Sequence, residues 1–188
     1  MKPIRLLFIA ALLFTGVANA QITKGNWMVG GSGSFTSSKN NSTYGFDGST
    51  SAYRINAFEL TPDIGYFFID KLAVGTVINF NYLGSPDSDL KGTHSYGIGP
   101  FVRYYFLKPE TRINVFAEAS YHYSFTDKSV IGKFETNGYA FKAGPAIFFN
   151  SSVALECTLQ YNYNKVNANS SDSGNFVVGL GFQIHLEK

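Results

Sequence analysis

The fold is decided by the stretch FELTPDIGYFFIDKLAVGTVINFNY, residues 58–82. Every second residue of its first half is apolar or aromatic, and the residues between them are small or polar. After a turn at residues 69–71 the alternation resumes. Because a period of two is the side-chain period of a β-strand, the stretch predicts an antiparallel hairpin. Its apolar face carries Phe58, Leu60, Pro62, Ile64, Tyr66, Phe68, Leu72, Val74, Thr76, Ile78, Phe80 and Tyr82.

The same alternation recurs along the chain and predicts eight strands, at residues 25–35, 58–68, 72–82, 95–106, 113–123, 137–149, 153–163 and 175–186. The connections between them alternate in length. Polar segments cover residues 36–52, 83–94, 124–136 and 164–174, and short turns fall at residues 69–71, 107–112 and 150–152. An even number of strands with long and short connections in turn is typical of a transmembrane barrel with extracellular loops and periplasmic turns. We therefore expect an all-β, eight-stranded antiparallel up-and-down transmembrane β-barrel, closed so that no strand edge is free.

The orientation of the apolar face follows from the width of such a barrel. An eight-stranded barrel has an interior only just wide enough to be filled by side chains. It cannot hold several large aromatic residues from every strand, so we expect the apolar set to face lipid and the small polar set to face the lumen. Each strand of the hairpin would be about 35 Å long, and a transmembrane strand needs about 9–11 residues.

The first twenty residues have the pattern of a secretory signal peptide. Lys2 and Arg5 precede an apolar run over residues 6–17, and Ala18-Asn19-Ala20 fits a cleavage site. We expect a signal peptide at 1–20 and one barrel domain at 21–188. The single Cys157 excludes an intramolecular disulfide, and its place in the alternation faces lipid.

Composition limits the classes of function. The net charge is +2 and the Lys and Arg residues form no cluster, which argues against a nucleic-acid partner. The chain has 16% aromatic residues, 19 Gly and only 15% charged residues, as expected of a barrel in contact with lipid. His94 and His185 have no ligand spacing, so neither a metal site nor a cofactor is predicted.

Three segments place a Pro before an aromatic cluster next to a short turn: residues 61–68, 99–106 and 144–149. We expect these clusters to form the periplasmic aromatic girdle. Pro62, Pro100 and Pro145 cannot donate to a β-ladder, so each predicts a bulge or a missing hydrogen bond at a similar height.

Together these features resemble the small outer-membrane barrels of the OmpX and OmpA transmembrane-domain type, including barrel-domain proteins common in Bacteroidetes. The ending GLGFQIHLEK, residues 179–188, is similar to the family's C-terminal assembly signal at Gly181, Ile184 and Leu186, although Leu186 replaces the usual aromatic residue. The resemblance implies localisation in the outer membrane, contact with its lipids and lipopolysaccharide, recognition by the barrel assembly machinery, exposed loops and often no catalytic activity.

The candidate site is the charged set on the inward face: Glu59, Asp63, Arg103, Glu118, Lys142 and Glu156. Such charges could form an ion-selective constriction, or they could pair with one another and plug the lumen. We favour closure by paired charges because the lumen is narrow. Arg103 and Glu118 lie on neighbouring strands and are the predicted pair.

Two further hypotheses concern other residues. Tyr44 and Phe46 lie in the longest polar segment and could contact an extracellular ligand, or the segment could be simply solvated. His122 and Ser124 have the H-x-S spacing of outer-membrane lipid A deacylases, with Glu135 as a third member, but a polar lumen rim is the favoured interpretation. We expect a non-enzymatic barrel with a structural or adhesion-like role. A narrow, porin-like pore is the first alternative and a lipid A-modifying hydrolase the second.

Overall fold

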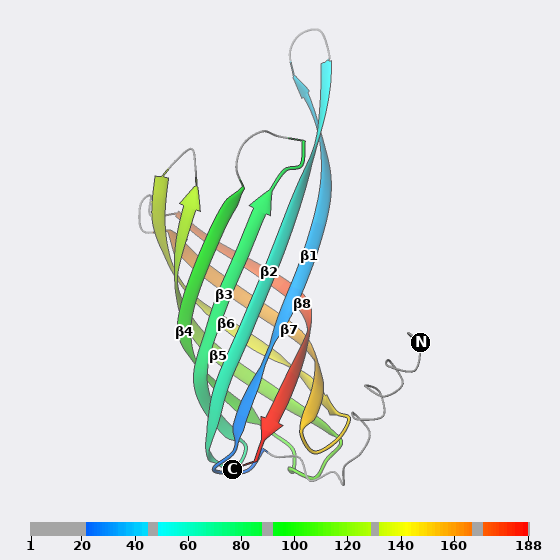
Figure 1. Ribbon diagram of the computed structural model, residues 1–188, viewed down its shortest axis with the longest axis vertical. Coiled ribbons are helices and arrows are strands. Elements are labelled where there is room, and N and C mark those ends of the chain that lie inside the picture. The colour runs from blue at the N-terminus through cyan, green and yellow to red at the C-terminus, as the bar shows by residue number, and fades with distance from the viewer. Residues whose placement is uncertain (1–21, 45–48, 88–91, 129–131, 167–170, 188) are drawn as a thin grey trace, which may run out of the picture.

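The computed structural model describes residues 22–44, 49–87, 92–128, 132–166 and 171–187. The strands form one closed barrel in sequence order, with every neighbouring pair antiparallel (Figure 1). The predicted fold class is therefore confirmed. Their bounds are β1 (Trp27–Tyr44), β2 (Ser49–Ile69), β3 (Leu72–Gly84), β4 (Thr93–Tyr105), β5 (Ile113–Lys128), β6 (Gly132–Phe148), β7 (Val153–Val166) and β8 (Ser171–Leu186).

No helix in the described part of the chain is long and apolar enough to cross a membrane. The predicted signal peptide lies outside the described residues and stays a prediction.

The polar connections were predicted too long. Much of segment 36–52 is strand, because β1 and β2 stay paired as far as Tyr44 opposite Ser49. Strands β5 and β6 likewise continue into segment 124–136, as far as Lys128 opposite Gly132. Beyond the membrane both faces of a strand can be polar, so the apolar alternation stops although the ladder continues. As a result the β1–β2 hairpin rises well above the rest of the barrel (Figure 1).

The predicted assignment of the two faces is correct for the central hairpin. Phe58, Ile64 and Val74 are exposed on the outer surface, whereas Ala73 and Val77 are buried in the lumen. The predicted periplasmic girdle is wrong for one residue of each aromatic cluster. Phe67, Tyr105 and Phe148 point inward and are buried, and only their neighbours in the clusters face outward. The strict alternation of side chains requires this, since consecutive residues cannot share one face.

Each of the three prolines interrupts the ladder to the next strand without shifting its register. Pairing of β2 with β3 stops between Leu60 and Asp63, and pairing of β4 with β5 stops between Ile98 and Phe101. The ladder between β6 and β7 has the same gap around Pro145. The missing bonds are thus confirmed, and no bulge is needed to accommodate these prolines.

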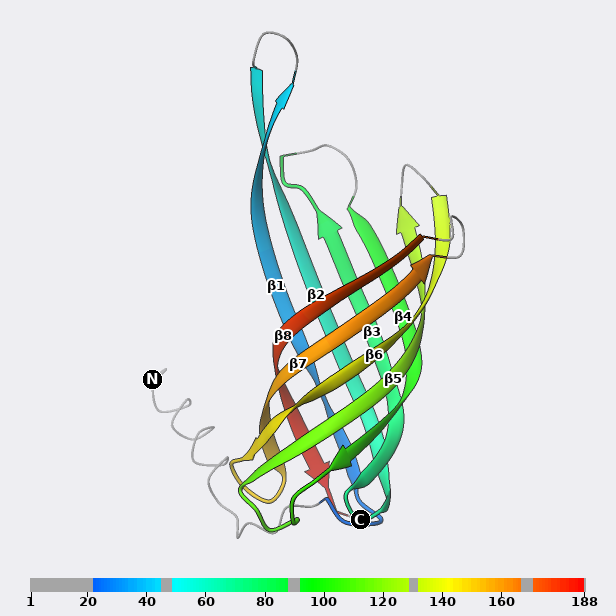
Figure 2. The same cartoon turned by 180° about the vertical axis from the view of Figure 1, so that it is seen from behind.

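The ladder that closes the barrel, between β1 and β8, is short. Strand β1 pairs with β8 only from Trp27 opposite Leu186 to Ser32 opposite Gly181. Above this point, within the described residues, β8 stays paired with β7 alone as far as Ser171. Figure 2 shows β8 leaning away from β1 as both leave the end that holds the C-terminus. We call the two unpaired edges, residues 33–39 of β1 and 171–180 of β8, the seam. The expectation that no edge is free is therefore correct for β1 and β8 only over residues 27–32 and 181–186.

Candidate functional site

Charged side chains form a layer across the lumen. Arg103 of β4, Glu118 of β5 and Lys142 of β6 are successive cross-strand partners on the inward face. Arg103 Nε donates to Glu118 Oε2 at 2.7 Å, and Lys142 Nζ lies 2.8 Å from Glu118 Oε1. The predicted pair of Arg103 and Glu118 is therefore confirmed.

Two carboxylates from other walls complete this ionic layer. Glu156 of β7 accepts a hydrogen bond from Arg103 Nη1 at 2.7 Å across the lumen. Asp63 of β2 lies 3.9 Å from Arg103 Nη2, and Gln183 Nε2 donates to its two carboxylate oxygens at 2.8 and 2.9 Å. Arg103 is fully buried and binds carboxylates from three strands, so it is the centre of the layer.

An apolar layer lies between the ionic layer and the end of the barrel that carries the short turns, and we call it the plug. The guanidinium of Arg103 stacks on the ring of Phe116 at 4.5 Å, which joins the two layers. The ring of Tyr105 lies 5.8 Å from Phe116 and 6.1 Å from Phe67. His185 packs among these rings, 5.7 Å from Phe67. The buried members of the plug are Ile22, Met28, Phe67, Phe101, Tyr105, Phe116, Phe148 and His185.

The segment before β1 covers the plug from below. The Ile22 carbonyl accepts a hydrogen bond from the Lys71 N–H at 2.8 Å, and Gly25 N–H donates to the Phe67 carbonyl at 2.9 Å. Phe67 N–H in turn donates to the Asn26 carbonyl at 3.0 Å. Gly25 has φ +96°, a conformation that favours glycine. The segment is thus hydrogen-bonded to the β2–β3 turn and buries the Ile22 side chain under the barrel.

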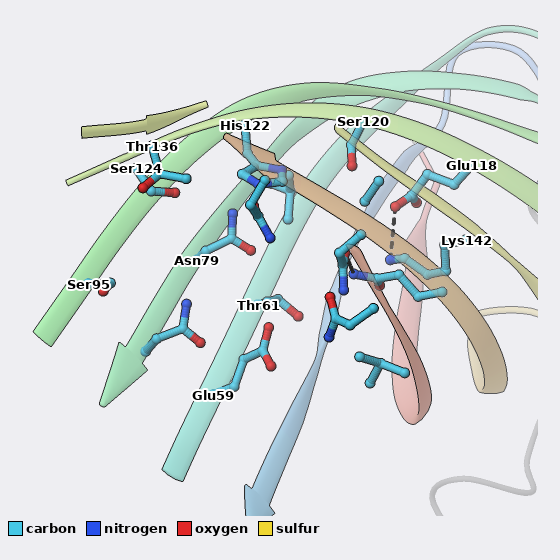
Figure 3. A pocket seen from close by; sticks show the side chains of 18 of the residues that line it. Glu59, Thr61, Asn79, Ser95, Glu118, Ser120, His122, Ser124, Thr136 and Lys142 are labelled. Carbon is cyan, nitrogen blue, oxygen red and sulfur yellow. Dashed lines mark hydrogen bonds and ion pairs between the residues drawn. The ribbon is translucent and has the colours of Figure 1, made fainter. Parts of the chain in front are cut away.

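Above the ionic layer the lumen opens into a polar cavity of about 310 Å³ (Figure 3). Glu118 and Lys142 form its floor, and hydroxyl and amide side chains line its walls. Glu59 lies on this wall and not in the ionic layer, so the structure separates it from the other five predicted site residues. The polar lining includes Thr61, Asn79, Asn81, Ser95, Ser120, Thr126, Gln160, Asn162, Asn164 and Asn175.

His122 and Ser124 line the same cavity, but Glu135 does not join them. Glu135 alternates with the inward Thr136, is exposed on the outer surface and hydrogen-bonds Tyr123. His122 Nε2 is instead 2.7 Å from Asn164 Oδ1. The hypothetical catalytic set is not assembled, because one residue of offset from the inward Thr136 moves the Glu135 side chain to the opposite face.

The remaining predicted residues lie at the two ends of the barrel. Tyr44 ends β1 opposite Ser49, at the top of the β1–β2 hairpin, and Phe46 lies outside the described residues. Gly181, Ile184 and Leu186 are in the part of β8 that pairs with β1. Ile184 and Leu186 face outward, as an assembly signal read from the membrane side would require. Among the described residues, no cluster of His, Cys, Asp and Glu could hold a metal ion.

Solved structures with a similar fold are small outer-membrane barrels. The N-terminal β-barrel domain of Pseudomonas aeruginosa OprF is 13% identical, with a TM-score of 0.57 over 87% of this chain and 98% of that domain. The outer membrane protein OprG from Pseudomonas aeruginosa is 14% identical, with a TM-score of 0.55 over 90% and 100% of the two chains. Neisserial surface protein A is 14% identical, with a TM-score of 0.54 over 86% and 97%.

No family model matches the sequence, and no curated protein matches it. At these identities the similarity concerns the fold. The chain has the fold of the small eight-stranded outer-membrane barrels, with an ionic layer and a plug inside it.

Proposed function

We propose that this chain, a barrel of the outer-membrane type, resides in the outer membrane as a non-conducting barrel with a structural or surface-interaction role. The observation that carries the proposal is the double closure of the lumen. An ion moving along the axis would have to displace Arg103 from Glu118 and Glu156, and then cross a layer of packed aromatic rings.

The two layers block an ion for different reasons. In the ionic layer Arg103 and Lys142 are already paired with Glu118 and Glu156 at 2.6–2.8 Å. The plug offers an incoming ion few polar groups, chiefly the Tyr105 hydroxyl and the His185 imidazole, and transfer of a bare ion among its packed rings is strongly unfavourable. Opening one layer therefore leaves the other in place.

The surface role is assigned to the β1–β2 hairpin, which rises highest of the strands (Figure 1). Its paired strands continue through a polar stretch of sequence and suit a stiff projection that contacts an extracellular partner. Outer-membrane lipids and lipopolysaccharide would surround the apolar belt, and the barrel assembly machinery would read the end of β8.

Planar-bilayer recording of the refolded barrel tests the proposal, with folding checked by heat-modifiable migration on a gel. We expect no discrete current steps from the native protein. Glu118→Ala should also be silent, because the plug remains. Discrete steps whose size changes in Glu118→Ala would refute the closed lumen and establish the narrow pore instead.

A further inference from the structure

The seam is an unusual feature of a membrane barrel. If the register of β1 and β8 continued above Ser32 and Gly181, Ser34 would lie opposite Gly179. The ladder instead ends at that point, and the two strands diverge (Figure 2). An unpaired N–H or C=O group in a bilayer costs several kcal/mol when nothing polar is near it. Something must therefore solvate these two edges.

The space between the edges is hollow and leads to the lumen. A pocket of about 40 Å³ is lined by residues 32–34 of β1 and 177–179 of β8. One water molecule needs only about 10–15 Å³ by this measure. The pocket shares Glu59, Thr61, Gln160, Asn162 and Val177 with the polar cavity, so the seam connects that cavity to the outer surface of the barrel.

The outer rim of the seam is the most exposed apolar surface of the described barrel. Its four side chains have higher exposed fractions than any other large apolar residue described. They are Val178 at 82%, Phe176 at 72%, Phe35 at 68% and Leu180 at 60%. Phe35 lies on β1 and the other three lie on β8, so apolar groups flank the opening on both sides.

The inner side of the seam has the opposite chemistry. Thr61, Gln160 and Asn162 present hydroxyl and amide groups, and Glu59 presents a carboxylate. Within the described residues Glu59 has no ion pair. The basic side chains of the lumen, Arg103 and Lys142, are paired with Glu118 and Glu156 instead. An anionic group entering here would meet an uncompensated negative charge, whereas a neutral or cationic group would not.

We propose that the seam binds a single-chain amphiphile whose headgroup is neutral or cationic and carries hydroxyl or amine groups. The headgroup lies in the polar cavity, where it solvates the unpaired edges, and the chain lies outside along Phe176, Val178 and Leu180. A strand from a second copy would fit less well, because the edges diverge and their inner sides are polar and hollow.

The test is an NMR titration of the protein in phosphatidylcholine nanodiscs with dodecyl glucoside. We expect saturable shifts confined to the seam, at the amides of residues 32–34 and 177–179 and at the side-chain amides of Gln160 and Asn162. Dodecyl phosphate has the same chain with an anionic headgroup and should bind at least about tenfold more weakly. Glu59→Gln should bring the two affinities to within about threefold, chiefly by improving the binding of the phosphate.

A matched pair of variants tests where the headgroup lies. Val177→Trp fills the inner end of the pocket, and Val102→Trp makes the same substitution on the outward face of β4, outside the seam. The first should weaken binding of dodecyl glucoside at least about tenfold by steric exclusion, and the second should leave it within about twofold. If Val177→Trp does not fold, Ser34→Trp fills the same pocket from the β1 edge.

Three outcomes would overturn the proposal. The first is shifts spread evenly around the outer apolar belt, and the second is equal effects of the two tryptophan variants. The third is a seam that is closed without amphiphile. Closure within one chain would appear as cross-strand contacts between Ser34 and Gly179, and closure between two copies as protection of the edge amides that depends on protein concentration. That last form of closure would identify a second copy of the chain as the occupant.

Discussion

Replacing Arg103 with Met should destabilise the barrel more than any other single change in the ionic layer. In the native protein three carboxylates, Asp63, Glu118 and Glu156, face the two cations Arg103 and Lys142. After Arg103→Met, Lys142 still pairs with Glu118, but Glu156 and Asp63 lose their buried cation. Removing one partner of a buried ion pair costs about 3–5 kcal/mol. The unfolding equilibrium should therefore shift by about two to three and a half orders of magnitude.

The matched control is Glu156→Gln, which removes a charge of the opposite sign at the same contact. It leaves two carboxylates facing two cations, and the new amide oxygen can still accept the hydrogen bond from Arg103 Nη1. We expect a cost below about 1.5 kcal/mol, the net contribution of one hydrogen bond. The difference in unfolding free energy between the two variants measures how far the layer depends on a cation to balance its carboxylates.

The assay is urea unfolding and refolding in lipid vesicles, followed by far-UV circular dichroism and by the fluorescence of Trp27, the only tryptophan. The double variant should cost less than the sum of the single ones by more than about 0.5 kcal/mol, because the two side chains are in contact. A cost of Arg103→Met below about 1 kcal/mol, or one equal to that of Glu156→Gln, would refute the reasoning. The carboxylates would then be solvated by water and would not depend on Arg103.

Two further predictions concern the plug and the topology. Phe67→Ala should cost about 3–5 kcal/mol in the same unfolding assay, because Phe67 is fully buried among rings. Phe68→Ala, on the lipid-facing side, should cost less than half of that. Equal costs would place Phe67 outside the plug. In a Cys157→Ser background on intact cells, Ser38→Cys in the β1–β2 hairpin should react with a membrane-impermeant maleimide, and Glu110→Cys in the β4–β5 turn should react only after the outer membrane is permeabilised. Labelling in the reverse order would invert the proposed orientation.

The sequence predicts those features of this barrel that depend on local alternation. The faces of the 58–82 hairpin and the pairing of Arg103 with Glu118 both follow from the period of two on adjacent strands. The contacts of Arg103 with Glu156 and Asp63 cross the lumen between strands that are not neighbours. The alternation within a single strand cannot predict such contacts, so only the structure reveals them.

The plug was missed although the sequence contained its signal. Three aromatic residues in a row, as in Tyr66-Phe67-Phe68, must send at least one ring into the lumen, since side chains alternate between faces. The same holds for Tyr105 in its cluster. Assigning whole clusters to the girdle ignored this constraint. The covering segment at Ile22 carries no comparable signal, because it is a short turn defined by backbone hydrogen bonds to residues about 45 positions away.

The plug limits what the opening at the seam can do. The β1–β8 contact joins the two ends of the chain, so where its ladder stops is a property of barrel closure that neither strand encodes alone. Because the ionic layer and the plug close the lumen toward the short turns, a headgroup that entered through the seam would find no onward path along the axis. The cavity is therefore suited to hold an amphiphile at the level of the outer leaflet and not to pass it inward. The protein would then bind the amphiphile and retain it, because the closed lumen prevents its passage through the barrel.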